Sequence, residues 1–184
     1  MVTVRDLKDQ VVLVDRHDAP IGTRDKLEVH RTGELHRAFS VFVFDARDRL
    51  ILQQRALDKY HSGGLWTNTC CSHPRPGEAV GEAAERRLRE EMGIHCQAIE
   101  HQFTFIYRAE VDNGLVEHEL DHVLFARYTG DVRPNDREAM AWRAVTDAEL
   151  DQELRTVPDR FTAWLRICWP MVKERRGAVL RRAV

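Results

Sequence analysis

Cysteine is scarce in this sequence. Only four occur among its 184 residues, at Cys70, Cys71, Cys96 and Cys168. Adjacent cysteines rarely bridge each other because the geometry is strained, and the remaining spacings resemble no disulfide framework. We therefore expect free thiols in an intracellular protein, with Cys96 and Cys168 as small, buried apolar residues.

An excess of one charge is also missing. The 28 Lys and Arg residues nearly balance the 30 Asp and Glu residues, which leaves a formal net charge of -2. No general affinity for nucleic acid or a membrane surface is therefore expected. No stretch approaches the roughly 20 apolar residues of a membrane span, and residues 1–15 lack the cleavage pattern of a signal peptide. We expect a cytoplasmic protein that is a monomer or a weak dimer.

Repeats, linkers and low-complexity segments are absent from the sequence as well, so one globular domain with extensions is expected. We divide it into an N-terminal extension (1–34) that contributes a strand and site residues, a catalytic domain (35–170) and a basic, solvated tail (171–184).

Strands are predicted at 11–15, 38–45, 50–55, 66–71, 97–111, 115–128 and 141–145, with hairpins at ARDR and VDNG. Helices are predicted over 78–92, ending at Gly93, from a capping box at Thr146, and from Pro158. This order indicates an α/β (α+β) fold in which helices sandwich a mixed sheet.

A charged helical segment is the first motif that carries chemistry. Residues 72–94 resemble the Nudix box, G-x5-E-x7-R-E-U-x-E-E-x-G-U, in which U is apolar. The matching residues are Glu78, Arg86, Leu88, Glu90, Glu91, Gly93 and Ile94. Two positions depart from the pattern: Ser72 replaces the first glycine, and Arg87 replaces a catalytic glutamate. A solvated helix with i,i+4 charge pairs is the alternative, and this many matches in one fixed frame disfavours it.

The departure at Arg87 has a physical meaning. In the usual box, glutamates three and four residues apart share a helix face and bind divalent cations, which assist the attack of water on a diphosphate. Arginine removes one negative charge from that face, so the site should hold fewer cations and can bind a phosphate directly. A protein that binds a diphosphate without hydrolysing it would tolerate this change.

Histidine and glutamate form a second candidate site. Two histidines flank the short loop RTGEL, a third follows Cys71, and two glutamates at i and i+2 of a predicted strand point to the same face. The set is His30, His36, His73, Glu117 and Glu119. Such ligands suit Mn²⁺, Zn²⁺ or Fe²⁺, and Mg²⁺ less well. Because scattered histidines are more often surface residues, spacing alone leaves this metal site a hypothesis.

Three segments together resemble type I isopentenyl diphosphate isomerase, a Nudix-fold family that interconverts isopentenyl and dimethylallyl diphosphate. They are HRTGELHRAFSVFVFD (30–45), QQRALDKYHSGGLWTNTCCSHPRPGE (53–78) and VEHEL (116–120). The resemblance extends from Val11 to Trp169, and its WTN-x-x-C-x-HP motif is highly specific. The family's own Nudix box carries arginine at the position of Arg87, so this departure from the general Nudix pattern supports the resemblance.

The resemblance implies a role for each site residue. Cys71 would be the catalytic cysteine and Cys70 a packing residue. Glu119 would be the second catalytic group, with Tyr107 beside it and Trp164 over the reacting carbons. The implied ligands of a divalent cation (Mn²⁺, Mg²⁺ or Zn²⁺) are His30, His36, His73, Glu117 and Glu119. A Mg²⁺ that arrives with the small-molecule diphosphate would be held by Glu91 and the Cys71 carbonyl. The implied diphosphate-binding cations are Lys26, Arg55, Lys59 and Arg87.

Two alternatives stay open at this point. A Nudix pyrophosphohydrolase has the same fold and a different reaction, although hydrolysis needs neither Arg87 nor Cys71. A non-enzymatic module could hold a structural ion with the histidines and Glu117.

Overall fold

The computed structural model describes residues 9–96 and 98–182. Gln97, where one predicted strand begins, and the last two residues of the predicted tail lie outside this range. The strands are β1 (Gln10–Val14), β2 (Pro20–Asp25), β3 (His36–Phe44), β4 (Leu50–Arg55), β5 (Trp66–Thr67), β6 (Cys70–Ser72), β7 (Ile99–Glu110), β8 (Val116–Arg127) and β9 (Ala139–Val145). The helices are α2 (Lys26–Thr32), α3 (Val80–Met92), α4 (Asp147–Thr156) and α5 (Ala163–Arg182), with 3₁₀ turns at Asp112–Gly114 and Pro158–Arg160.

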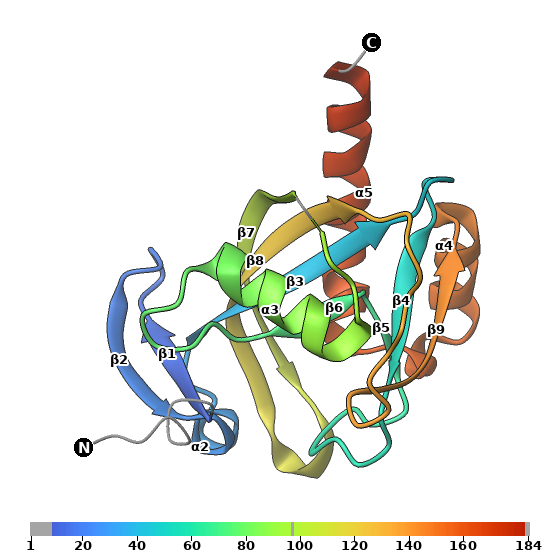
Figure 1. Ribbon diagram of the computed structural model, residues 1–184. Coiled ribbons are helices and arrows are strands. Elements are labelled where there is room, and N and C mark those ends of the chain that lie inside the picture. Colours follow the sequence, from blue (N-terminus) through green and yellow to red (C-terminus); the bar gives the residue numbers. More distant parts are fainter. Residues whose placement is uncertain (1–8, 97, 183–184) are drawn as a thin grey trace.

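Strand β3 lies at the centre of a mixed sheet (Figure 1). Along one edge it pairs in parallel with β8, from His36↔Glu119 to Phe44↔Arg127. Its other edge is shared by β1, β6 and β4, all antiparallel. Strand β7 pairs antiparallel with β8, and β9 with β4. The predicted mixed sheet is therefore confirmed. Its pairings place the start of β3 beside the end of β6 and the first half of β8.

Helices cover both faces of this sheet. On β3, Phe39, Val41 and Val43 pack in the same core cluster as the buried residues of α3. The alternate residues Phe42 and Phe44 pack in a second cluster with α4 and α5. Because β3 is buried on both faces, six of its residues after Arg37 are apolar on both sides of the strand, interrupted only by Ser40, and they do not alternate with polar ones. The predicted sandwich of helices around a sheet is confirmed (Figure 1).

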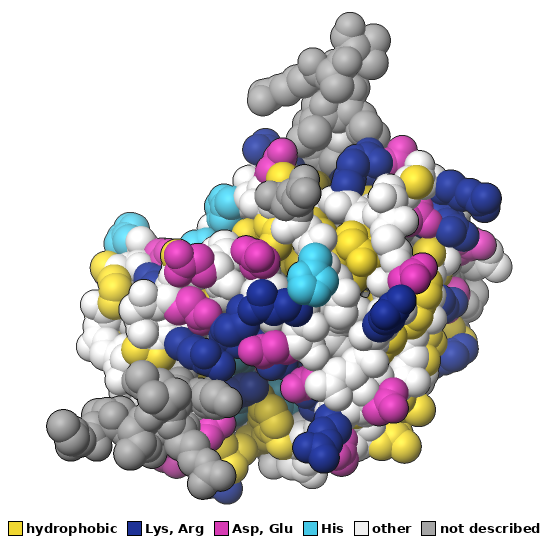
Figure 2. All heavy atoms as spheres, in the orientation of Figure 1, with side chains coloured by type: hydrophobic (Ala, Val, Ile, Leu, Met, Phe, Trp, Pro, Cys, Tyr) yellow, Lys and Arg dark blue, Asp and Glu magenta, His cyan; other side chains and the backbone are white. Residues whose placement is uncertain are grey.

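Helix α3 forms as its sequence predicts, except at its start. Its buried residues Ala83, Ala84, Leu88 and Met92 recur at helical spacing and face the sheet. Acidic and basic side chains are interspersed over its outer surface (Figure 2). Gly93 adopts a left-handed conformation (φ 63°) and ends the helix, as predicted. The helix begins at Val80, two residues later than expected.

The helix predicted from Pro158 and the strand predicted over 66–71 need correction. No α-helix begins at Pro158, because the 3₁₀ turn there leads into extended backbone at Phe161, which bridges to Trp66, and α5 begins only at Ala163. The strand predicted over 66–71 is two short strands, β5 and β6. They are separated at Asn68 and Thr69, whose side chains bond the backbone of β3 and β4. The hairpin predicted at ARDR is present: the Asp45 amide donates to the Arg49 carbonyl and Phe44 pairs with Leu50, beyond which β6 pairs with β3 and β9 with β4.

The N-terminal segment contains more structure than the sequence predicted. Besides the expected β1, it forms β2 and the short helix α2, which starts at an Asp25 N-cap and ends at Gly33 in a left-handed conformation. Helix α5 continues without interruption past Pro170 to Arg182. Within the described ranges, no helix is both long and apolar enough to cross a bilayer.

Candidate active site

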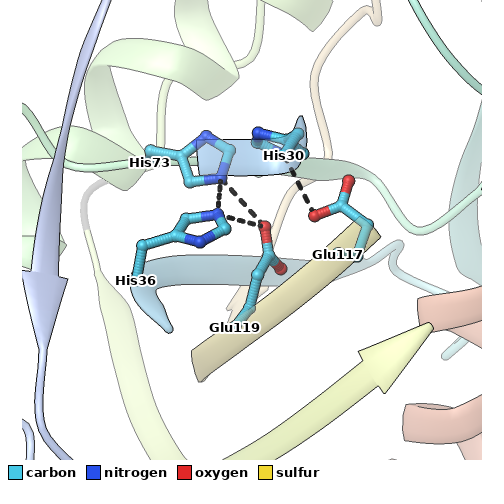
Figure 3. Close-up of side chains that lie close together, drawn as sticks. All are labelled: His30, His36, His73, Glu117 and Glu119. Carbon is cyan, nitrogen blue, oxygen red and sulfur yellow. Dashed lines mark hydrogen bonds and ion pairs between the residues drawn. The ribbon is translucent and has the colours of Figure 1, made fainter. Parts of the chain in front are cut away.

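Four different elements bring the five predicted metal ligands together. His30 lies on α2, His36 begins β3, His73 follows β6, and Glu117 and Glu119 lie two residues apart on β8. One ligand atom from each residue lies within 4.8 Å of all the others (Figure 3). The i, i+2 spacing on β8 places both carboxylates on one face, as the sequence predicts. His118 and His122 face the opposite side, where they bond Gly33 and Asp18.

The backbone orients two of the imidazoles toward the centre of this cluster. His30 donates from Nδ1 to the Lys26 carbonyl at 2.6 Å, and His36 donates from Nδ1 to the Glu34 carbonyl at 2.9 Å. In the neutral ring each Nε2 then keeps its lone pair, and that lone pair faces inward. The Nε2 atoms of His36 and His73 are only 3.2 Å apart.

Two atoms facing this centre are buried and unsatisfied. Within the described part of the chain, His30 Nε2 and Glu117 Oε2 have no hydrogen-bond partner, although they lie only 3.2 Å apart. Unsatisfied buried polar atoms are costly and rare. A divalent cation would satisfy both, and nitrogen and carboxylate donors are what such cations accept. The residues present therefore fit a metal ion.

The two carboxylates differ in their proton affinity. Burial would raise the pKa of Glu117, but the imidazoles of His30 and His61, which face its two oxygens, outweigh it and hold that pKa well below its usual range. For Glu119, burial and the nearby charge of Glu117 raise the pKa. Burial also lowers the pKa of His73 well below its ordinary value, which keeps that imidazole neutral. A protonatable carboxyl thus lies beside a carboxylate that stays charged.

The candidate catalytic residues line one cleft that opens beside this cluster. Its walls include Cys71, Tyr107, Glu119 and Trp164. The Tyr107 hydroxyl donates to Glu119 Oε2 at 2.6 Å. Burial raises the pKa of the Cys71 thiol to about 12, so this group holds its proton at neutral pH. Cys70 is instead buried in the core cluster beneath α3.

The four predicted diphosphate-binding cations line the same cleft: Lys26, Arg55, Lys59 and Arg87. Burial lowers the pKa of Lys26, whose ammonium lies 4.9 Å from the centre of the Tyr60 ring. The Arg55 guanidinium lies 5.2 Å from the ring centre of Trp164. Arg87 bonds two glutamates of its own helix, Glu90 at 2.8 Å and Glu91 at 2.7 Å. Glu91 is buried in the cleft wall and also accepts from Gln53 at 2.8 Å.

Two residues of this site were missed by the sequence analysis. Glu138 forms ion pairs with both Lys59 and Arg87, yet nothing in its sequence context indicated this position. His61 is buried against Glu117, with Nε2 2.9 Å from Oε1. Its place in the segment that also carries Arg55 and Lys59 was an available signal.

Comparisons with known proteins identify the family of this chain. The sequence pattern described as the NUDIX domain matches residues 34–165. Isopentenyl-diphosphate Delta-isomerase 1 of Aromatoleum aromaticum is 53% identical over 162 residues, which cover 88% of this chain and 91% of that protein. Isopentenyl-diphosphate Delta-isomerase of Pectobacterium atrosepticum is 49% identical over 166 residues, covering 90% and 92%.

Solved structures share the fold at low sequence identity. DR0079 from Deinococcus radiodurans superimposes with a TM-score of 0.68 at 16% identity and covers 80% of this chain and 90% of its own. A MutT protein from Methanosarcina mazei has a TM-score of 0.62 at 15% identity, covering 76% and 94%. These likenesses establish the fold, whereas the high identities extend over nearly the whole length of the named isomerases. The chain therefore belongs to the NUDIX domain family and, within it, to the isopentenyl-diphosphate Delta-isomerases.

Proposed function

We propose that this protein interconverts isopentenyl diphosphate and dimethylallyl diphosphate by protonation and deprotonation through a tertiary carbocation. The observation that carries the proposal is the position of Glu119, which belongs to the histidine–glutamate cluster and also lines a cleft shared with the Cys71 thiol. The close relatives bear the name of this activity.

The reaction requires two proton-transfer groups. The alkene of isopentenyl diphosphate is unactivated, so a proton must add to its terminal carbon while the π electrons form the new C–H bond. A second proton then leaves the carbon on the other side of the cationic centre, and its electron pair forms the new double bond. Of Cys71 and Glu119, one would donate the first proton and the other would accept the second. The two residues exchange these roles when the reaction runs in reverse.

The cleft must also protect the carbocation. The Trp164 ring offers a π face, a contact worth roughly 0.5–2 kcal/mol and more when water is excluded. The Tyr107 hydroxyl, already bonded to Glu119, would hold that carboxyl in position and share its proton. When bound to the histidine–glutamate cluster, a divalent cation (Mn²⁺, Mg²⁺ or Zn²⁺) would lower the proton affinity of Glu119 and strengthen its acid form.

The diphosphate would serve as the handle that orients the alkene. Lys26, Arg55 and Lys59 supply positive charge at the cleft, and Arg87 lies there with its glutamate partners. Glu91 and the Cys71 carbonyl would hold a Mg²⁺ that enters with the substrate. Both Glu91 oxygens already accept hydrogen bonds, from Gln53 and Arg87, and the cation would use lone pairs that these bonds leave free.

A specific contact disfavours the hydrolase alternative. In a pyrophosphohydrolase the helix glutamates are free to bind the cations that assist water attack. Here Arg87 is paired with both Glu90 and Glu91. A module that only stores a metal ion would have no need for the thiol and the cationic cleft beside the cluster.

We also propose that the protein acts in the cytoplasm as a monomer or a weak dimer. All four cysteines are free thiols, which a reducing compartment maintains. Size-exclusion chromatography over a range of concentrations would test the oligomeric state.

The decisive experiment is proton exchange. The protein is incubated with isopentenyl diphosphate in D₂O, and the label is followed by NMR. We expect dimethylallyl diphosphate to accumulate, with deuterium at the carbons that gain protons. Release of orthophosphate or a monophosphate without isomerisation would instead establish the hydrolase.

A further inference from the structure

Glu117 is held between two imidazoles, and only one of them belongs to the proposed ligand set. Oε2 lies 3.2 Å from Nε2 of His30, inside the cluster. Oε1 lies 2.9 Å from Nε2 of His61, on its other side. His61 is 3% exposed and stacks on His30 with ring centres 5.6 Å apart. It is not among the residues whose ligand atoms converge within 4.8 Å.

The turn that carries His61 is fixed from two directions. From the β7–β8 connection, Asp112 accepts from the Ser62 amide at 2.8 Å, and Asn113 donates to the Tyr60 carbonyl at 3.0 Å. From β4, the Arg55 guanidinium donates to the carbonyls of His61 and Ser62 at 3.1 and 3.2 Å.

The backbone of this turn is also strained. Ser62 adopts a φ of 52°, a left-handed conformation that is unfavourable for a residue with a side chain. At the next position, a Cβ on Gly63 would lie 2.5 Å from the Leu57 carbonyl oxygen, so only glycine fits. A strained and heavily anchored turn thus presents one buried imidazole to one carboxylate oxygen.

We propose that His61 is a positioning residue that donates from Nε2 to Oε1 of Glu117 and thereby directs Oε2 toward the metal. The inference rests on the proposed metal site. The terminal torsion of a glutamate is broad, so a carboxylate without this bond would sample orientations that do not ligate. The Ser62 hydroxyl lies 3.2 Å from Nδ1 and can donate to it, which leaves Nε2 as the protonated nitrogen. A charged imidazole would also donate from Nε2, so the role does not depend on the charge of His61.

Two substitutions separate this role from simple packing. His61→Gln places an amide N–H near the position of Nε2, whereas His61→Leu keeps much of the volume and removes the donor. A matched control is His122→Leu, which removes a histidine that bonds Asp18 outside the cluster. The measurement is Mn²⁺ affinity of the chelator-treated full-length protein, by competition with a fluorescent chelator, together with the EPR spectrum of bound Mn²⁺. Thermal melts of the metal-free variants report folding.

Loss of an outer hydrogen bond to a metal ligand typically weakens affinity about 10–100-fold. We expect that loss for His61→Leu, a broadened EPR spectrum, substantial recovery in His61→Gln and no change in the control. Wild-type affinity in the leucine variant, or equal losses in both His61 variants, would overturn the positioning role. A wild-type protein that binds no Mn²⁺ would instead overturn the metal site itself.

Discussion

Tyr107 and Glu119 face each other across the β7–β8 ladder, and the Tyr107 hydroxyl donates to Glu119 Oε2 at 2.6 Å. The other oxygen, Oε1, faces the imidazoles and lies 2.9 Å from Nε2 of His73. One carboxyl thus has a phenol on one side and the histidine–glutamate cluster on the other. This division allows Glu119 to serve as a ligand and as a proton-transfer group.

Glu119→Gln tests the second of these roles. The amide retains one oxygen that can coordinate a metal but loses the titrating proton. General acid–base groups contribute on the order of 10²–10⁴-fold in rate, and we expect a loss at the upper end because the alkene is unactivated. Turnover and metal content are measured on the same sample, with Tyr107→Phe for comparison. A glutamine variant with normal metal and a near-normal rate would mean that Glu119 is only a ligand.

The adjacent cysteines provide a matched pair. Cys71→Ala should abolish isomerisation while diphosphate binding and folding persist, because its thiol lines the cleft. Cys70→Ala should keep most of the activity and lose some stability, because that side chain is buried in the core. With a pKa of about 12, the Cys71 thiol should also react slowly with iodoacetamide at neutral pH, as measured by mass spectrometry. The reverse pattern of activity in the two variants would contradict this assignment.

Metal removal should inactivate the protein reversibly. Prolonged treatment with EDTA is expected to abolish isomerisation, and Mn²⁺ or Mg²⁺ should restore it. Elemental analysis should find the ion in the wild type and not in His36→Ala, because the His36 Nε2 points into the cluster. Full activity in a sample shown to be free of metal would remove the cation from the proposal.

The ion pair between Glu78 and Arg86 predicts how stability depends on pH. Arg86 holds both Glu78 oxygens, at 2.6 and 2.8 Å, and this pairing lowers the pKa of Glu78 below its ordinary 4.5. A lowered folded-state pKa stabilises the protein above pH 4.5, and the contribution is lost as the pH falls through the folded value. Glu78→Gln should therefore melt below the wild type at about pH 7, and the difference should close in acid. A difference that does not change with pH would mean that the effect is not the ion pair.

The sequence predicted those parts of the fold that depend on local pattern. The long strands around VDNG, the glycine stop at Gly93 and the shared face of Glu117 and Glu119 follow from spacing along one element. The failures lie where distant segments decide the structure. Asn68 breaks a predicted strand because its amide bonds the carbonyl of Val41 on β3. Phe161 stays extended because it bridges to Trp66.

The candidate site likewise contains residues that the sequence predicts and residues whose roles depend on distant segments. Its proposed ligands and catalytic groups follow from the resemblance, since spacing alone leaves the histidines ambiguous. His61 and Glu138 were missed because their roles arise from contacts between segments far apart in the chain. Glu138, for example, reaches Lys59 and Arg87 from the loop before β9. No periodicity in the sequence reports such a contact.

The last prediction concerns Arg87, which stands where the ordinary Nudix box has glutamate. Arg87→Glu restores that pattern, but the new carboxylate would join Glu90, Glu91 and Glu138, the three groups that Arg87 now pairs with. We expect isomerase activity to fall and the melting temperature to decrease, because like charges would repel one another beside the proposed diphosphate site. Efficient hydrolysis should not appear, since the remaining cleft residues, Cys71 and Glu119 among them, are the groups proposed to act on the alkene.

Arg87→Gln separates the two contributions, because it removes the cation without adding an anion. A role in substrate binding predicts a raised KM in this variant with a smaller change in kcat. Glu138→Gln should lower KM, because it releases both Lys59 and Arg87 from a competing carboxylate. Isomerisation is followed by NMR and phosphate release by a colorimetric assay on the same samples. Robust pyrophosphatase turnover in Arg87→Glu would show that this single side chain separates the two chemistries of the fold.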